Sequence, residues 1–277
     1  MSNHGGNDMA TDESSSTLPL VAVTGAAGRV GRITARALAG RYRLRLIDLD
    51  WPDSVEEDPL DAAVNDAERV AADLREPQAC AAAVESVDLL VHLAGQPSPQ
   101  IGVREAVEDV AMPTANLAAA VRDSAVRRVV FASSIHTMGL YDRHGQNPID
   151  PTWTTRPCCE YGSAKVLSEN LLRLLTERTP TSVVCLRLGL TGALPPTAYA
   201  MSQWLGDDDY TDLLRRALTA DVTFGTYFGV SAKARERWDV SNGEADLGYV
   251  PSQVPPEPED PDAEQDSGHC LMVPPGR

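Results

Sequence analysis

The sequence predicts an α/β fold in which a doubly wound parallel sheet of about seven strands carries helices on both faces. Short apolar runs alternate with amphipathic segments along the chain, which is the order expected of repeated β-α-β units. The apolar runs are continuous stretches rich in Val and Leu, as expected for strands that are buried on both faces. Apolar residues make up 43% of the 277, enough for one large core.

The elements follow one another in the order that this fold requires, and right-handed crossovers are expected between parallel strands. The predicted strands are residues 18–24, 44–48, 70–74, 89–95, 129–134, 183–188 and 226–230. The predicted helices are residues 28–39, 78–85, 103–123, 161–177 and 210–220.

Composition divides the chain into three parts. Residues 1–17 are rich in Gly, Ser and acidic residues, and they are expected to be disordered. Residues 18–250 form the predicted single domain, with a substrate lobe mainly in 190–250. Residues 251–277 are rich in Pro and acidic residues and are expected to be a tail. The N-terminal segment has no Lys, Arg or apolar stretch of the kind a signal peptide needs.

Charge and hydropathy exclude several classes of function. The net charge of −16 repels phosphate backbones, so nucleic-acid binding is not expected. No apolar run approaches the length of about 20 residues that spans a bilayer, so no membrane segment is expected. These features predict a cytoplasmic protein that acts on a small molecule.

The five cysteines show no CxxC spacing, and reduced thiols are expected. Cys80 and Cys185 lie in apolar patterns and are predicted to be buried. Cys158 and Cys159 are adjacent, and a disulfide between them would be strained. The acidic run 207–209 is predicted to be a solvated cluster at a helix start. No metal site is therefore predicted.

A glycine-rich turn follows the first predicted strand. After LPLVAVT the chain reads Gly-Ala-Ala-Gly-Arg-Val-Gly, and this GxxGxxG turn opens a helix. Glycine lets the backbone approach a pyrophosphate, and the free N–H groups of the helix N-terminus attract it. The predicted dinucleotide contacts in this turn are Gly25, Ala27, Gly28, Arg29, Val30 and Gly31.

A carboxylate closes the second predicted strand. Asp48 lies at the expected distance of about 20 residues from the turn, where it can accept hydrogen bonds from ribose hydroxyls and repel the 2′-phosphate of NADP. Leu49 follows, where an arginine would attract that phosphate, although Arg29 keeps some NADP binding conceivable. The pattern predicts NAD, with NADP as the less favoured cofactor.

Two more strand ends are predicted to reach the same cofactor. Asp73 and Leu74 end the third strand, and Asp73 is interpreted either as a contact to the adenine amino group or as a turn residue. The backbone of Leu93, Ala94 and Gly95 is expected to pass under the adenosine.

Three residues are candidates for the chemical step. Tyr161 and Lys165 have the i, i+4 spacing that places both side chains on one face of a helix. A nearby ammonium group, together with the positive ring of a bound cofactor, would favour the phenolate and lower the pKa of the tyrosine, which is ordinarily near 10. Lys165 and Lys233 are the only lysines of the chain. Ser134 ends the fifth strand, at the edge of the sheet where a cofactor crevice is expected.

Together with Asp48, the segments TGAAGRVG, HLAG, FASS and YGSAK resemble the extended short-chain dehydrogenase/reductase superfamily over about residues 18–251. VVFASSIHTMGLYD, RPCCEYGSAKVLSENLLRLL, SVVCLRLG, AMSQWLGDDD and YFGVSAKARERWDVSNGEADLGYVP are similar to uronate dehydrogenases and related NAD-dependent sugar dehydrogenases. The resemblance implies a Rossmann-type sheet with a small C-terminal substrate lobe.

The resemblance also implies a role for each candidate residue. Tyr161 would be the catalytic acid/base, Lys165 would tune it and bind the nicotinamide ribose, and Ser134 would hold the reacting oxygen. His136 falls where the family has a histidine that contacts substrate, and a purely structural histidine is an equally good interpretation. The apolar stripe of 166–175 is compatible with the homodimers that this superfamily forms, or with packing inside the chain.

The sequence departs from the uronate dehydrogenase pattern at three places. Ile135 replaces an asparagine that contacts substrate, and Ala200 stands where an arginine pairs with the substrate carboxylate. The asparagine that often assists proton transfer is replaced by Val110 in one alignment, with Asn116 on a neighbouring face of the helix. Ser98, Ile135, His136, Ala200 and Trp204 are the predicted substrate contacts, although Trp204 and Trp238 fit core positions equally well.

The missing arginine predicts a neutral substrate with a ring and hydroxyls. We expect an NAD-dependent oxidoreductase that interconverts a secondary alcohol and a carbonyl of a sugar-like or nucleoside-like metabolite. A ketoreductase in the biosynthesis of a natural product, such as an antibiotic, would fit this description. The alternatives are a uronate or aldose dehydrogenase that forms a lactone, an epimerase or dehydratase that retains its NAD, and a non-catalytic dinucleotide sensor.

Overall fold

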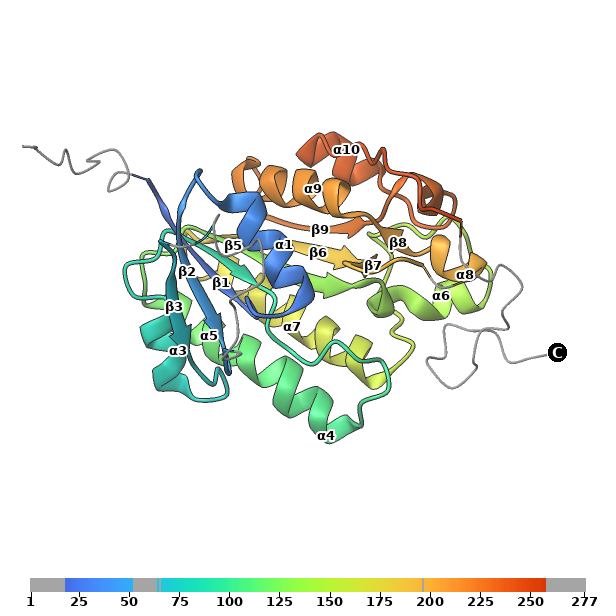
Figure 1. Ribbon diagram of the computed structural model, residues 1–277. Helices are drawn as coiled ribbons and strands as arrows, with labels where there is room; N and C mark the ends of the chain where they lie inside the picture. Colours follow the sequence, from blue (N-terminus) through green and yellow to red (C-terminus); the bar gives the residue numbers. More distant parts are fainter. Residues whose placement is uncertain (1–17, 52–63, 65, 196, 258–277) are drawn as a thin grey trace, which may run out of the picture.

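The computed structural model describes residues 18–51, 64, 66–195 and 197–257, and it confirms the predicted α/β class. Seven parallel strands form one sheet in the order β3-β2-β1-β4-β5-β6-β9 (Figure 1). The strands are β1 (Leu20–Thr24), β2 (Arg43–Asp48), β3 (Glu68–Ala71), β4 (Leu89–His92), β5 (Arg128–Ser134), β6 (Ser182–Leu188) and β9 (Phe224–Gly229).

Helices cover both faces of this sheet, as the continuous apolar strands require (Figure 1). On one face, α1 (Arg29–Leu38), α9 (Asp207–Thr219) and α10 (Ser241–Leu247) bury side chains in a common cluster with the strands. On the other face, α3 (Pro77–Ala83), α5 (Met112–Arg122) and α7 (Glu160–Thr176) do the same. Cys80 and Cys185 are both buried on this second face, as predicted.

The strand order reverses between β1 and β4, because the chain leaves β1 for β2 on one side and later returns to β4 on the other. At such a switch point the loops that follow the two strands diverge and leave a crevice at their carboxyl ends. The glycine turn follows β1, and residues 93–95 follow β4. The topology therefore brings these two segments together.

A smaller set of elements lies beside the carboxyl end of the sheet. It includes α6 (Gly139–Arg143), α8 (Ala198–Met201) and the short parallel pair of β7 (Leu190–Thr191) and β8 (Trp204–Leu205). Met138, Phe228 and Trp238 belong to a separate apolar cluster, against which Leu140 and Tyr141 of α6 pack. No helix among the described residues is long and apolar enough to cross a membrane.

Several element boundaries differ from the prediction. β3 ends at Ala71 rather than at 74, because the Asp73 carboxylate accepts a hydrogen bond from the Arg75 N–H and forms a turn. β4 ends at His92, before Gly95, whose φ of +143° leaves the strand conformation. The predicted helix 103–123 consists of α4 (Val103–Ala106), a π-helical turn over Val107–Ala111, and α5.

The prediction that residues 207–209 are a solvated cluster is wrong for Asp209. Its side chain is buried and accepts hydrogen bonds from the Ser231 hydroxyl, at 2.6 Å, and from the Gln253 N–H, at 3.0 Å. The first residues of the predicted tail therefore pack against α9. Residues 1–17, for which disorder was predicted, and residues 258–277 of the predicted tail lie outside the described residues.

Candidate active site

A cavity of about 1080 Å³ opens at the carboxyl ends of the strands. It contains all the predicted cofactor contacts from the turn and the strand ends: Gly25, Ala27, Gly28, Arg29, Val30, Gly31, Asp48, Leu49, Asp73, Leu74, Leu93, Ala94 and Gly95. Ser134, Tyr161 and Lys165 line it as well, with Ile135 and His136. Sequence positions up to 140 residues apart thus form one continuous wall, large enough for a dinucleotide and a small substrate.

The glycine turn needs glycine at two positions for steric reasons. Gly25 has a φ of +71°, and a Cβ there would lie 2.8 Å from the backbone nitrogen of Ala94. A Cβ on Gly31 would lie 2.1 Å from the carbonyl oxygen of Gly25 and 2.6 Å from the Cα of Ala26. The turn can therefore pack this closely against both α1 and the β4 loop only without side chains, which leaves its outer surface open to a ligand.

Asp48 lies against this turn at the end of β2. One carboxylate oxygen accepts a 2.8 Å hydrogen bond from the Ala27 N–H, and the other accepts one of 2.8 Å from the Leu49 N–H. The carboxylate is thereby fixed on the cavity wall with lone pairs still available. The Leu49 side chain is largely exposed and offers no charge to a phosphate.

A buried histidine at the end of β4 contacts the residue that precedes the glycine turn. The His92 ring lies 2.8 Å from the Thr24 hydroxyl through Nδ1 and 3.0 Å from the Thr114 hydroxyl through Nε2. The same Thr24 oxygen accepts hydrogen bonds from the N–H groups of Leu93 and Ala94. Burial, together with the charge of Lys165, lowers the pKa of His92 to about 3, so the ring is neutral.

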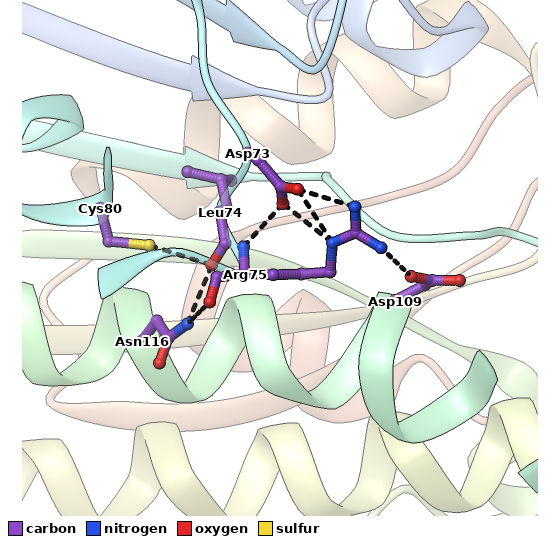
Figure 2. Close-up of polar contacts among 6 residues, drawn as sticks. All are labelled: Asp73, Leu74, Arg75, Cys80, Asp109 and Asn116. Carbon is purple, nitrogen blue, oxygen red and sulfur yellow. Dashed lines mark hydrogen bonds and ion pairs between the residues drawn. The ribbon is translucent and has the colours of Figure 1, made fainter. Parts of the chain in front are cut away.

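Asp73 also lines the cavity, in the loop after β3, where it contacts Arg75 (Figure 2). Both of its oxygens accept hydrogen bonds from the Arg75 guanidinium, which also reaches Asp109 at 3.3 Å. This ion pair lowers the pKa of Asp73. Asn116 donates to the carbonyls of Leu74 and Arg75, so α5 holds the loop in place. The contacts favour the turn interpretation of Asp73.

The three candidate catalytic residues converge at the other end of the cavity. Tyr161 and Lys165 are buried on α7, and Ser134 is buried at the end of β5. The Lys165 ammonium donates a 2.7 Å hydrogen bond to the Ala132 carbonyl and lies 5.7 Å from the centre of the Tyr161 ring. Burial lowers the pKa of Lys165 to about 8.

The protein's own side chains do not lower the pKa of Tyr161. Burial raises it above its ordinary value, and the hydrogen bond with the Ser134 hydroxyl opposes that rise only in part. The surrounding side chains therefore leave Tyr161 as a neutral phenol. Loss of its proton requires a further positive charge or a reacting oxygen in the cavity.

A buried ion pair fixes α7 to the sheet. Arg187 of β6 makes two hydrogen bonds to Glu169 of α7, at 2.9 and 2.8 Å, and donates a third to the Pro151 carbonyl. The Ser133 hydroxyl donates to the same carboxylate. Glu169 lies one helical turn after Lys165, and its charge raises the pKa of that lysine against the effect of burial.

The predicted substrate residues divide into two groups. Ile135 and His136 line the cavity, and the His136 ring stands edge-on to Tyr161 with 5.7 Å between ring centres. Ser98, Ala200 and Trp204 are not among the lining residues. Trp204 is buried and donates its indole N–H to the Ala193 carbonyl, so a packing role explains its position.

Gln203 lines the cavity and was not predicted. Its backbone carbonyl accepts a 2.7 Å hydrogen bond from the Leu190 N–H, which fixes the residue beside β7. Its side-chain nitrogen is buried without a hydrogen-bond partner among the described residues. A buried donor without a partner is unfavourable unless a ligand accepts its hydrogen bond, so this amide is suited to binding substrate.

The central helix places no amide beside Tyr161 at either candidate position. Val110 is buried in the same apolar cluster as Tyr161 and Ala164. The Asn116 side chain donates to the Leu74 carbonyl in the loop after β3. The π-helical turn around Val110 widens the helix where it passes the cavity, a feature often found at functional sites.

Comparison with known proteins agrees with this geometry. Residues 21–192 match the family described as "NAD dependent epimerase/dehydratase family". The NAD-dependent glucose-6-phosphate dehydrogenase of Haloferax volcanii is 30% identical over 244 residues, covering 83% of this chain and 92% of that one. A uronate dehydrogenase of Pseudomonas syringae pv. tomato is 33% identical over 238 residues, covering 83% of this chain and 80% of that one.

A solved structure gives the same result for the fold. A tyrosine-to-alanine mutant of uronate dehydrogenase from Agrobacterium tumefaciens, complexed with NAD, superposes with a TM-score of 0.77 at 27% identity. The match covers 92% of this chain and 96% of that one. The family match extends over more than half of the chain and includes the glycine turn, Asp48, Ser134, Tyr161 and Lys165. The chain therefore belongs to the NAD-dependent epimerase/dehydratase family of enzymes, with the Rossmann-type fold of the short-chain dehydrogenases/reductases.

Proposed function

We propose that the protein is an NAD-dependent dehydrogenase that interconverts a secondary alcohol and a carbonyl on a neutral, cyclic, sugar-like or nucleoside-like substrate. One observation carries the proposal: Ser134, Tyr161 and Lys165 converge at one end of a cavity whose other end is the glycine turn and Asp48. A proton-transfer group and a dinucleotide cradle in one cavity are what a hydride-transfer enzyme requires.

The residues of the turn suit NAD. Gly25 and Gly31 let the turn pack closely against the β4 loop and against itself, and the N-terminus of α1 offers free N–H groups to the pyrophosphate. Asp48 would accept hydrogen bonds from the adenosine ribose and repel a 2′-phosphate. When bound, NAD supplies the carbon that accepts or returns the hydride.

The three catalytic side chains would manage the proton. In the oxidative direction Tyr161 would react as the phenolate, after release of its own proton to solvent, and its oxygen would receive the proton of the substrate hydroxyl while Ser134 hydrogen-bonds the reacting oxygen. Lys165, which is held by the Ala132 carbonyl, keeps a positive charge beside the phenol and favours its ionised form. In the reductive direction the same groups return the proton to the forming alkoxide.

We infer a neutral substrate from the charged side chains that line the cavity. The cationic side chains among the described lining residues are Arg29 in the glycine turn, Arg75, which is paired with two aspartates, and Lys165. Ala200, at the position of the expected arginine, ends in a methyl group and does not line the cavity. Ile135 adds an apolar wall, and the Gln203 amide offers a neutral donor to a hydroxyl or ring oxygen.

A substrate panel tests the proposal through the absorbance of NADH. Neutral cyclic pentoses and hexoses, nucleosides, the matching uronic acids and sugar phosphates are each offered with NAD, and cyclic ketones with NADH. We expect a neutral compound to give kcat/KM at least about tenfold above its uronic acid, the effect of one missing ion pair of about 1.4 kcal/mol or more. Preferred oxidation of glucuronate or galacturonate would refute the argument from Ala200.

The same panel separates the alternative activities. Net formation of a lactone identifies an aldose dehydrogenase, and turnover of a cyclic ketone with NADH identifies a ketoreductase of the kind used in natural-product biosynthesis. Isomerisation or dehydration of a nucleotide sugar without net NADH, by enzyme that retains NAD after purification, identifies an epimerase or dehydratase and contradicts the proposal.

We also propose that the enzyme is a homodimer. Leu167 and Leu174 lie seven residues apart on α7 and are 47% and 43% exposed, and Met112 of α5 is 42% exposed. A second copy of the same helices would cover these apolar side chains. Light scattering should give the mass of a dimer for the wild type and the mass of a monomer for Leu167→Glu.

A further inference from the structure

Three potential metal ligands gather beside the cavity. His136, in the 3₁₀ turn that follows β5 (Ile135–Met138), and the adjacent Cys158 and Cys159, just before α7, place their ligand atoms within 4.8 Å of one another. His136 Nδ1 lies 3.3 Å from the Cys158 sulfur and 3.5 Å from the Cys159 sulfur. Neither cysteine forms a disulfide. We propose that these three side chains bind one thiophilic metal ion, with Zn²⁺ as the expected species.

The spacing of the ligand atoms agrees with such an ion. With Zn–S bonds of about 2.3 Å and Zn–N bonds of about 2.05 Å, a tetrahedral site separates sulfur from nitrogen by about 3.6 Å. The two observed separations of 3.3 and 3.5 Å are within a few tenths of an ångström of that value. Two sulfurs and one imidazole form a Cys₂His set, in which the fourth position is left to water or to a substrate oxygen.

The backbone already holds the three ligands in place. The Cys158 N–H donates to the His136 carbonyl, and a Cβ on Gly162 would lie 2.5 Å from that same carbonyl oxygen. Cys159 is the N-cap of α7, where its sulfur accepts a hydrogen bond from the Gly162 N–H. The first turn of α7 is therefore locked against the His136 turn, and little rearrangement is needed before an ion binds.

Charge and access also favour a metal ion. On binding, each thiol releases its proton to solvent, and the two thiolates cancel the charge of Zn²⁺. A neutral site of this kind suits a place where Cys158 is buried and the other two ligands are half-buried. His136 lines the cavity, so the ion has a route from solvent.

The expectation that the chain has no metal site rested on the absence of CxxC spacing. The three ligands form no local motif, since the histidine precedes the cysteines by 22 and 23 residues. Pairing of β5 with β6 and docking of α7 against the end of β5 bring them together. The proposal does not depend on the proposed dehydrogenase activity, because metal binding is measured without substrate.

The experiment uses the full chain, reduced, stripped with a chelator and freed of any tag. Titration with Zn²⁺ by calorimetry should give one ion per chain, and Co²⁺ should give a thiolate-to-metal charge-transfer band. In Cys158→Ala/Cys159→Ser, affinity for Zn²⁺ should fall by about 100-fold or more, and the band should disappear. Serine keeps the N-cap of α7, so the melting temperature and NAD affinity check that the variant is folded.

Two matched controls make the result specific. Cys80→Ala removes a buried thiol elsewhere, and His269→Ala/Cys270→Ala removes the adjacent His and Cys of the predicted tail. Both variants should keep the band and the stoichiometry. If the double cysteine variant is unstable, Cys159→Ser alone should still lose the charge-transfer intensity of one thiolate. The proposal is overturned if the wild type takes up no Zn²⁺, or if binding survives in Cys158→Ala/Cys159→Ser; loss of binding in the tail control instead would place the ion at His269 and Cys270.

Discussion

Replacement of Glu169 by glutamine should destabilise the protein strongly, because it leaves a buried guanidinium without its counter-ion. The side chains of Arg187 and Glu169 are 3% and 6% exposed and share two hydrogen bonds below 3 Å. Removal of one partner of a buried ion pair costs about 3–5 kcal/mol. With a urea m-value of about 3 kcal/mol/M, the midpoint of unfolding should fall by about 1 M or more.

The matched control is the double variant Glu169→Leu/Arg187→Met, which removes both charges and keeps the volume apolar. It should recover more than half of the lost free energy of unfolding, because apolar replacement of a buried ion pair is often tolerated. Urea unfolding followed by circular dichroism measures both variants. A loss below about 1 kcal/mol for Glu169→Gln would refute the account of this pair as buried and essential to the position of α7.

Glu169→Gln should also change the pH dependence of activity. The carboxylate of Glu169 raises the pKa of Lys165, which burial has lowered to about 8. Without that charge the pKa of Lys165 falls further. Because the proposed role requires a protonated lysine, the alkaline limb of kcat should move to lower pH, and an unchanged profile would contradict the coupling.

Three further predictions concern other parts of the site. Gly31→Ala puts a methyl group 2.1 Å from the Gly25 carbonyl, so it should cost about 1–3 kcal/mol of stability and weaken NAD binding, both measured by thermal shift with and without NAD. His92 has its pKa lowered to about 3 in the folded chain, so the unfolded chain binds a proton that the folded chain does not between about pH 6.5 and 3. As the pH is lowered through this range, the free energy of unfolding should therefore fall by up to about 1.4 kcal/mol per pH unit. In His92→Gln this part of the pH dependence should be absent. Gln203→Leu should lower kcat/KM by about 3- to 10-fold with normal NAD affinity, the effect of one neutral hydrogen bond, and wild-type kinetics would remove the residue from the substrate site.

Local patterns in the sequence were sufficient to predict most of the fold. The continuous apolar strands and the helix 161–177 are reproduced within one or two residues, since burial on both faces leaves a direct mark on composition. The ends of β3 and β4 could not be predicted as well from the sequence. They depend on the turn made by Asp73 with Arg75 and on the backbone of Gly95, neither of which interrupts the apolar pattern.

The site was predictable where a motif is local and not where it depends on tertiary contacts. The glycine turn can be recognised from its local spacing, although only Gly31 meets its close contacts within a few residues and Gly25 packs against the distant Ala94. Gln203 gives no such signal, since its exposure to the cavity follows from the pairing of β7 with β8. The burial of Asp209 likewise depends on Ser231 and Gln253, far along the chain.

The most direct test of the central claim is the replacement of Tyr161 by phenylalanine, measured on the best substrate of the panel. This change removes one oxygen from a buried side chain and leaves the glycine turn, Asp48 and Lys165 in place. We predict that kcat falls by about 10²–10⁴-fold, as expected for the loss of a general acid/base, while the Kd for NAD stays at its wild-type value. Turnover at the wild-type rate would contradict the assignment of Tyr161, and loss of NAD binding together with turnover would show that the tyrosine supports the cofactor site instead.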